Sequence, residues 1–290
     1  MTTHLLLLIQ GEWFKLRRRW LPWILLAVAV LVSQAFLWGF YTVYHYMPKH
    51  PKRSPPPPIP NPALRRRFRR RLLGWYQRHG RDLPWRRTRN PYHILVSEIM
   101  LQQTQVDRVL PKYNEWITKY PTFQVLATTR LSHATRTWYP LGYNVRPKRL
   151  HAIAREVVAN HGGELPADAV TLRSFKGLGA YTVGAIQSFA FGRRAPIVDT
   201  NVARVLFRVF IAHGDAKSHA TKRHLWVISG ALLPRLQVFD FNQALMDLGA
   251  TVCVARQPAC HICPMKPICL SFPFTQDTGK RLNPKQRGSR

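Results

Sequence analysis

Four cysteines near the carboxyl end restrict what this chain can fold into more than any other feature of its sequence. They are the only cysteines among 290 residues, and their spacing is C-x6-C-x2-C-x5-C: Cys253, Cys260, Cys263 and Cys269. Such clustering argues against disulfides spread through a secreted domain. Four thiolates in one compact loop can bind a tetrahedral zinc ion or a cubane iron–sulphur cluster. Zinc sites more often use two close pairs, but the spacing alone leaves both metals open.

Charge indicates the class of partner. The chain has 44 Lys+Arg against 13 Asp+Glu, a formal net charge of +31. This excess is far larger than solubility requires, so we expect a polyanionic partner. Nucleic acid and an anionic membrane surface both satisfy that expectation.

A long uncharged segment, 21–47, follows the basic residues 1–20 and contains no Asp, Glu, Lys or Arg. It exceeds the ~20 residues needed to span a bilayer and has aromatic residues near both ends, so it predicts a transmembrane helix. A cleaved signal peptide is a second reading, although the apolar run of a signal is usually only about 7–15 residues. Translation starting at Met47 would remove the segment altogether.

Residues 48–63 contain eight prolines, a composition typical of a stiff, extended spacer. Basic residues flank the uncharged segment on both sides, with a modest excess after it, which favours a cytoplasmic carboxyl-terminal portion. We therefore expect a cytoplasmic protein, anchored to the inner face of the cell membrane if residues 21–47 span it. Residues 273–290 are short, polar and basic, as in a loose tail.

Helical periodicity dominates the region between the spacer and the tail. Asn90 and Pro91 form a typical N-cap and first helical position before a run of apolar residues at helical spacing. Further helices are predicted over 64–79, 106–119, 147–160, 180–191, 199–212 and 241–252. The pattern contains no convincing hairpin and no long repeat, so the expected fold class is all-α.

Two short motifs have chemical interest. The segment FKGLG, residues 175–179, lies between helical stretches, and its glycines permit a tight turn whose backbone N–H groups face an incoming anion. An ordinary helix–helix turn would use glycine equally well. The segment PIVDTNV places Asp199 at the start of a helix, where an isolated aspartate is more often an N-cap than a catalyst.

Together the motifs resemble a known family. SEIMLQQTQV, DLPWR, LGYNVR, FKGLGAYTVGAI, PIVDTNVARVL and the cysteine loop are similar, in order and spacing, to the iron–sulphur branch of the helix-hairpin-helix DNA glycosylases, above all the MutY-type adenine glycosylases. The resemblance covers residues 64–272. It implies a [4Fe–4S] cluster on the four cysteines and two helical domains with the active site between them. The cluster domain would comprise 64–84 plus 194–272, and a six-helix barrel with the helix-hairpin-helix would comprise 85–193.

The same resemblance implies a mechanism of base removal. Breaking an N-glycosidic bond needs a proton for the departing base and a negative charge beside the oxocarbenium-like sugar. By resemblance, Glu98 is the acid, in a pocket that raises its pKa, and Asp199 is the stabilising carboxylate oriented by Asn201. Tyr181 occupies the position of the lysine that attacks the sugar in bifunctional relatives. A tyrosine forms no Schiff base, so the resemblance implies a monofunctional glycosylase that leaves an abasic site.

Contacts with DNA are also implied. The partner would be double-stranded DNA with a mismatched or damaged base pair, bound by a monomer, and the target base would be flipped out of the stack. The positions that wedge into the stack or line the base pocket are Gln102, Gln103 and Tyr143. Gly177 and Gly179 would hold a backbone phosphate. Arg86 would touch the substrate strand.

The sequence departs from the family in three places. Thr200 replaces the glycine usual in MutY-type enzymes, the domain that recognises 8-oxoguanine has no counterpart after the cysteines, and the uncharged segment is foreign to the family. We therefore expect weak selectivity for the oxidised partner. A T:G or U:G mismatch glycosylase of the same superfamily is an alternative. A membrane-tethered DNA-binding protein without chemistry is another, although binding alone would not require Glu98, Asp199, Asn201 and Tyr181.

Overall fold

A computed structural model describes residue 23 and residues 26–39 and 59–274. The predicted basic segment at 1–20, most of the proline-rich spacer and nearly all of the basic tail lie outside the described residues. The chain divides into two compact units, Met1–Pro55 and Pro56–Arg290.

The first unit corrects one sequence-based expectation. Its described residues include a helical run over 26–39. Within the described residues, no helix is long and apolar enough to cross a membrane. The prediction of a transmembrane helix over 21–47 is therefore wrong, and membrane anchoring has no support.

The second unit is built from helices, and its described residues include no strand, which confirms the all-α class. The α-helices are α2 (Pro62–His79), α3 (Pro91–Met100), α4 (Val106–Lys119), α5 (Phe123–Thr128), α6 (Leu131–Trp138), α7 (Val145–Asn160), α8 (Ala169–Ser174), α9 (Ala180–Phe189), α10 (Thr200–Phe210), α11 (His219–Leu232) and α12 (Val238–Asp247). Short helical turns add η1 (Pro84–Arg86), the π-helical η2 (Leu248–Val252) and η3 (Lys266–Ile268).

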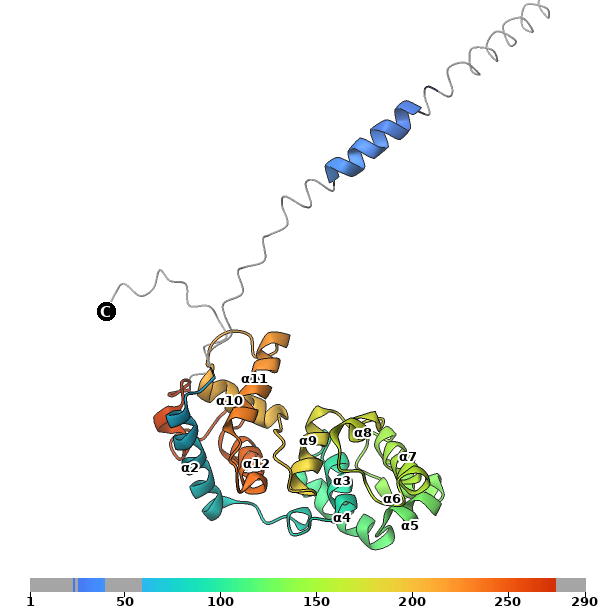
Figure 1. Ribbon diagram of the computed structural model, residues 1–290, viewed down its shortest axis with the longest axis vertical. Coiled ribbons are helices and arrows are strands. Elements are labelled where there is room, and N and C mark those ends of the chain that lie inside the picture. The colour runs from blue at the N-terminus through green and yellow to red at the C-terminus, as the bar shows by residue number, and fades with distance from the viewer. Residues whose placement is uncertain (1–22, 24–25, 40–58, 275–290) are drawn as a thin grey trace, which may run out of the picture. The chain divides into compact units, whose positions relative to one another are not determined.

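The helices fall into two groups that mix distant parts of the sequence (Figure 1). Helix α2 packs with α11 and α12, far along the chain, and α10 contacts α11, α12 and η2. Helices α3 to α9 form the other group, in which α5 packs on α7, and α3 on both α4 and α9. Contacts between α9 and α12 join the groups. The predicted domain boundaries at 84/85 and 193/194 stay a prediction.

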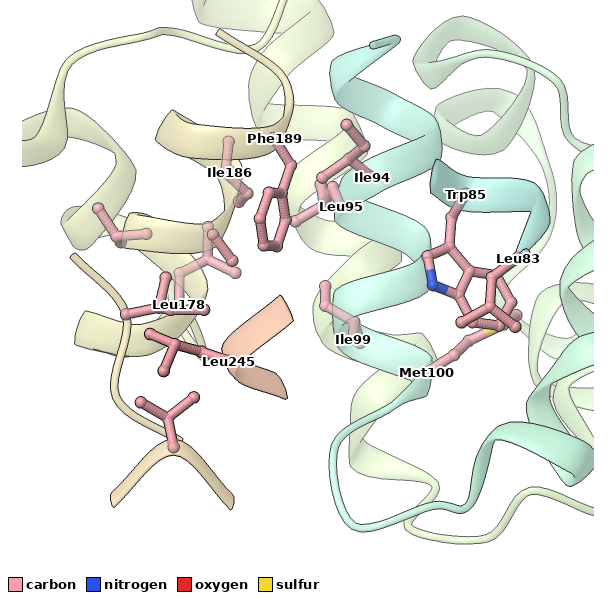
Figure 2. Close-up of a cluster of buried hydrophobic side chains, with 14 of the residues drawn as sticks. Leu83, Trp85, Ile94, Leu95, Ile99, Met100, Leu178, Ile186, Phe189 and Leu245 are labelled. Carbon is pink, nitrogen blue, oxygen red and sulfur yellow. The ribbon is translucent and has the colours of Figure 1, made fainter. Parts of the chain in front are cut away.

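Helix α3 is the central element for the site. Asn90 caps it, because its side-chain oxygen accepts from the backbone N–H of Tyr92 at 2.9 Å and Pro91 takes the first helical position. Every residue from Tyr92 to Met100 except His93 is buried. A helix that is buried on nearly all sides lies inside a core, and here the buried residues include Glu98. Figure 2 shows its Leu95 near Phe189 of α9, and its Met100 near Trp85 of η1.

Candidate active site

Glu98 lies near the end of α3 and is only 4% exposed. Its Oε2 atom is buried without a hydrogen-bond partner among the described residues. Burial raises the pKa of this carboxyl to about 7, and the charge of Asp199 adds to the rise, while Tyr181 and Arg86 oppose it. A carboxyl that exchanges its proton near neutral pH suits general acid chemistry.

Asp199 is the N-cap of α10, so the structural role expected of an isolated aspartate is present. One carboxylate oxygen accepts from the backbone N–H of Val202 at 2.6 Å, and the other accepts from the side-chain amide of Asn201 at 3.3 Å. Burial raises the pKa of Asp199, while these hydrogen bonds and the charge of Arg204 oppose the rise. The positive end of the α10 dipole also favours the charged form.

Tyr181, in the first turn of α9, lies beside both carboxyls. Its hydroxyl donates to Sδ of Met246 at 3.2 Å and lies close enough to Glu98 to lower the pKa of that carboxyl. Burial, followed by the charges of Glu98 and Asp199, raises the pKa of Tyr181 well above its ordinary value, so the phenol stays neutral. The structure thus gathers the four residues predicted to be catalytic from α3, α9 and α10.

Arg86, predicted to touch the substrate strand, has an internal partner, and its contact with DNA stays a prediction. Its guanidinium makes two hydrogen bonds to the buried carboxylate of Asp247, at 2.8 and 2.7 Å, and its side chain is only 7% exposed. Asp247 also accepts from the backbone and side chain of Arg81. A bidentate arginine–carboxylate pair of this kind holds the guanidinium in place, where its charge acts on Glu98.

Gln102, Gln103 and Tyr143 lie on two neighbouring turns outside the core. The glutamines follow the end of α3, and Tyr143 precedes α7 with 59% of its surface exposed. Gln103 and Tyr143 both have left-handed backbones, with φ of 57° and 49°. Non-glycine residues adopt this conformation rarely, and it tends to mark functional sites.

The turn between α8 and α9 has the geometry of an anion site. Gly177 has φ of 101°, and a Cβ placed there would meet Cδ of Arg149 at 2.6 Å. Gly179 is exposed, precedes α9 directly, and supplies no side-chain cap. Buried Leu178 anchors the turn. The first N–H groups of α9 therefore have no side-chain acceptor, which suits a phosphate oxygen.

The four cysteines line one pocket at the carboxyl end of α10 and η2. Its other walls are mainly apolar and include Val205, Val209, Leu248, Val252 and Met265. Arg208 donates to Sγ of Cys253 at 3.4 Å.

The four thiols are a donor set of the kind that holds an iron–sulphur cluster, and the mainly apolar walls of their pocket suit a buried centre. In the part of the chain that the structure describes, no three His, Cys, Asp or Glu side chains form a group that could hold a metal ion.

Arg204 is a feature that sequence reasoning missed. Its guanidinium donates to the side-chain oxygen of Asn201 at 2.8 Å and to the backbone oxygens of Gly249 and Cys253, both at 2.7 Å. The residue therefore connects the side chain that orients Asp199 with the start of the cysteine loop. Arg204 lies one turn after Asn201 on α10, and this spacing could have predicted that the two side chains contact each other.

Comparison with known proteins identifies the class. Residues 96–230 match the model of the HhH-GPD superfamily base excision DNA repair proteins, and the chain belongs to this family. Among its curated relatives are the adenine DNA glycosylases of Rattus norvegicus, 44% identical over 211 residues, and Mycolicibacterium smegmatis, 45% identical over 195 residues. The predicted likeness to MutY-type proteins is thus confirmed.

Coverage differs among these relatives. The matches take in 70% and 67% of this chain but 41% of the rat protein and 66% of the mycobacterial one. The chain therefore spans about two-fifths of the length of the rat relative.

Solved structures agree on the fold. A thermostable thymine-DNA glycosylase is 33% identical with a TM-score of 0.67, over 72% of this chain and 96% of that chain. An endonuclease III–DNA complex, trapped as a covalent intermediate, is 20% identical with a TM-score of 0.63, over 73% of this chain and 97% of that one. The second likeness concerns the fold alone.

Proposed function

We propose that this chain is a monofunctional DNA glycosylase that removes adenine mispaired with guanine or 8-oxoguanine and leaves an abasic site. The observation that carries the proposal concerns Glu98. This carboxyl is buried beside Asp199, and the pKa of Glu98 is raised to about 7. Burying a carboxyl with one oxygen left without a hydrogen-bond partner is costly and contributes nothing to simple DNA binding. The adenine DNA glycosylases among the relatives support adenine as the base.

The reaction assigns different work to the two carboxyls. Glu98 donates its proton to the flipped adenine, the bond between the base and C1′ of the sugar breaks, and the bonding electrons leave with the base. Asp199 stays ionised and stabilises the positive charge that develops on the sugar. Water adds to C1′ and gives its proton to Glu98, which restores the acid. Asn201 and the N–H of Val202 orient Asp199.

Tyr181 supports hydrolysis without strand cleavage. Its phenol, kept neutral beside Glu98 and Asp199, has no amine with which to attack C1′. The abasic strand therefore stays intact until it is treated with alkali.

DNA would be held by backbone groups and by charge. The turn at Gly177 and Gly179 offers N–H groups and the positive end of α9 to one phosphate, and the net charge of +31 attracts the duplex as a whole. Gln102, Gln103 and Tyr143 would enter the space that the flipped adenine leaves.

A [4Fe–4S] cluster would be held by Cys253, Cys260, Cys263 and Cys269. When bound, it supplies iron–thiolate bonds that close the loop around a buried centre. We expect about four irons per chain with broad absorbance near ~400 nm. Zinc without iron in the purified protein would contradict this assignment.

A second candidate substrate is thymine or uracil opposite guanine. The thermostable thymine-DNA glycosylase, 33% identical over most of its length, favours this alternative. Thr200, beside Asp199, departs from the MutY pattern in the same direction.

Four duplexes separate the candidates. The full chain is incubated with A opposite 8-oxoguanine, A opposite G, T opposite G and U opposite G, and each strand is analysed with and without alkali. We expect scission of the adenine strands only after alkali, lost in Glu98→Gln and Asp199→Asn and retained in the surface control Glu156→Gln. Scission of only the T or U strands would favour the second candidate. No product from any duplex would favour a DNA-binding protein without chemistry.

A further inference from the structure

Arg146 is a buried cation to which the proposed chemistry assigns no task. It lies in the first turn of α7, is 3% exposed, and has no acidic partner among the described ion pairs. A buried guanidinium is expensive unless its donors are satisfied. Its surroundings therefore show what it stabilises.

The guanidinium hydrogen-bonds to backbone oxygens on two separate segments. One terminal nitrogen donates to the oxygens of Ile99, Met100 and Gln102, at 3.3, 2.7 and 2.5 Å. The other donates to the oxygens of Leu141 and Gly142, at 3.0 and 3.1 Å. One side chain thus joins the end of α3 to the loop before α7.

The first segment carries Glu98 and the glutamines. Carbonyl groups in the last turn of a helix have no partner within the helix, and a cation there also satisfies the negative end of the helix dipole. Ile99 and Met100 occupy that turn, directly after Glu98, at the end of α3 visible in Figure 2. Gln102 and Gln103 follow after the C-cap residue, Leu101.

The second segment carries Tyr143. The backbone N–H of Arg146 donates to the oxygen of Tyr143 at 2.9 Å, and the guanidinium lies 5.3 Å from the centre of the Tyr143 ring and 5.3 Å from that of Trp138. The indole N–H of Trp138 donates to the oxygen of Gly142 at 3.2 Å.

Both turns have a backbone that needs support. Gln103 and Tyr143 have left-handed backbones, a conformation that is unfavourable for residues other than glycine and persists only where the surroundings enforce it. Arg146 is bonded to residues on or directly beside each of these positions. No other described side chain donates to backbone oxygens on both turns.

We propose that Arg146 is a positioning residue that holds the Gln102–Gln103 turn and the Tyr143 turn at the spacing needed to unstack and replace the target base. This proposal rests on the proposed function, because these two turns carry the residues that would fill the space left by the flipped adenine. Lysine keeps the charge but has three donors on one atom, so it cannot join the two segments as the planar guanidinium does.

The test compares the full chain with Arg146→Lys and with Arg155→Lys, a control at an exposed position of the same helix. Single-turnover excision is measured on an adenine–8-oxoguanine duplex and on the same sequence with the adenine in a one-nucleotide bulge. We expect Arg146→Lys to slow excision from the duplex by about 10- to 100-fold. The defect should shrink to within about threefold on the bulge, where the base is already unstacked. The control should match the unchanged chain on both substrates.

A second readout does not depend on excision. The probe is 2-aminopurine placed next to the target adenine, whose fluorescence rises when its neighbour leaves the stack. The unchanged chain should raise the fluorescence and Arg146→Lys should not, although circular dichroism shows both folded.

Several results would overturn the role of Arg146: an equal defect on duplex and bulge, no defect on either, or an unchanged fluorescence rise in the variant. If Arg146→Lys does not fold, Arg146→Gln takes its place, and failure of both to fold would mark a purely structural residue. If the unchanged chain excises nothing, the proposed function fails, while the fluorescence comparison still decides the role of Arg146. Absence of a rise even with the unchanged chain would contradict both.

Discussion

The protonation state of Glu98 is central to the proposed chemistry. Its pKa is raised to about 7 chiefly by burial, so near neutral pH both forms are populated. In the proposed reaction, Glu98 must be protonated and Asp199 must be ionised for the base to leave.

A pH profile of the single-turnover excision rate follows from this. The rate should fall as pH rises through about 7, because Glu98 loses its proton. It should fall again in acid, where Asp199, whose pKa is also raised, becomes protonated. A rate that stays constant from neutral to alkaline pH would show that another group donates the proton.

The same shift predicts that the acid destabilises the fold. Glu98 loses its proton near pH 4.5 in the unfolded chain but only near pH 7 in the folded chain. The contribution of protonated Glu98 to the stability of the fold is therefore complete below about pH 4.5 and is lost as the pH rises through about 7. The loss amounts to about 3 kcal/mol. Thermal unfolding should therefore show Glu98→Gln to be more stable than the unchanged chain at pH 8, with a smaller difference at pH 5. Equal or lower stability of the variant at pH 8 would contradict the burial of a free acid.

The burial of Glu98 could be predicted from the sequence, but the ion pair of Arg86 could not. Apolar neighbours along α3 indicated that the carboxyl would be buried, as it is. The resemblance implied a strand contact for Arg86, and nothing local in the sequence reveals the partner that the structure gives it, Asp247, which lies 161 positions away. Pairings over such separations depend on how helices pack, and a single sequence does not display them.

At the scale of elements, the turn between α8 and α9 offers a matched pair of glycines. Gly177 needs its positive φ, whereas Gly179 has φ of −81° and open space where an added methyl group would lie. Alanine at Gly177 should cost about 1–2 kcal/mol of stability. Alanine at Gly179 should leave stability nearly unchanged while its methyl group obstructs a phosphate.

Duplex affinity and thermal unfolding measured together test this assignment. We expect both Gly177→Ala and Gly179→Ala to bind duplex DNA more weakly, but only Gly177→Ala to unfold more easily. Unchanged affinity in Gly179→Ala would remove this turn from the DNA interface.

Helix prediction succeeded where periodicity and capping residues were strong. The range 106–119 is observed as α4 without change, and Asn90-Pro91 does begin α3. Helices α5, α6 and α8 were missed because each has only 6 to 8 residues, too few for an apolar period to stand out. Helix α11 was also missed, despite its Ser218 cap.

At the scale of the whole molecule, the net charge of +31 has a measurable consequence. Binding that neutralises phosphates releases counterions, so a protein with 6–10 phosphate contacts loses roughly 10³- to 10⁵-fold in affinity between about 50 and 200 mM salt. We expect a decrease of this size for an undamaged duplex, and the same salt dependence in Glu98→Gln. Affinity that hardly changes with salt would exclude the predicted polyanionic interface.

The uncharged amino-terminal segment was predicted wrongly from its composition. Composition over 21–47 satisfied the criteria for a membrane span, yet no helix among the described residues is long and apolar enough to cross a membrane. Apolar composition permits a spanning helix but does not by itself establish one.

The central claim is that this chain hydrolyses the bond between adenine and deoxyribose with Glu98 as the acid. Its most direct test is to measure free adenine by mass spectrometry after the full chain, in excess, is mixed with an adenine–8-oxoguanine duplex. We expect one adenine per duplex and an intact, alkali-labile strand, with release abolished in Glu98→Gln although that variant still binds the duplex. No free adenine from the unchanged chain, or equal release by Glu98→Gln, would contradict it.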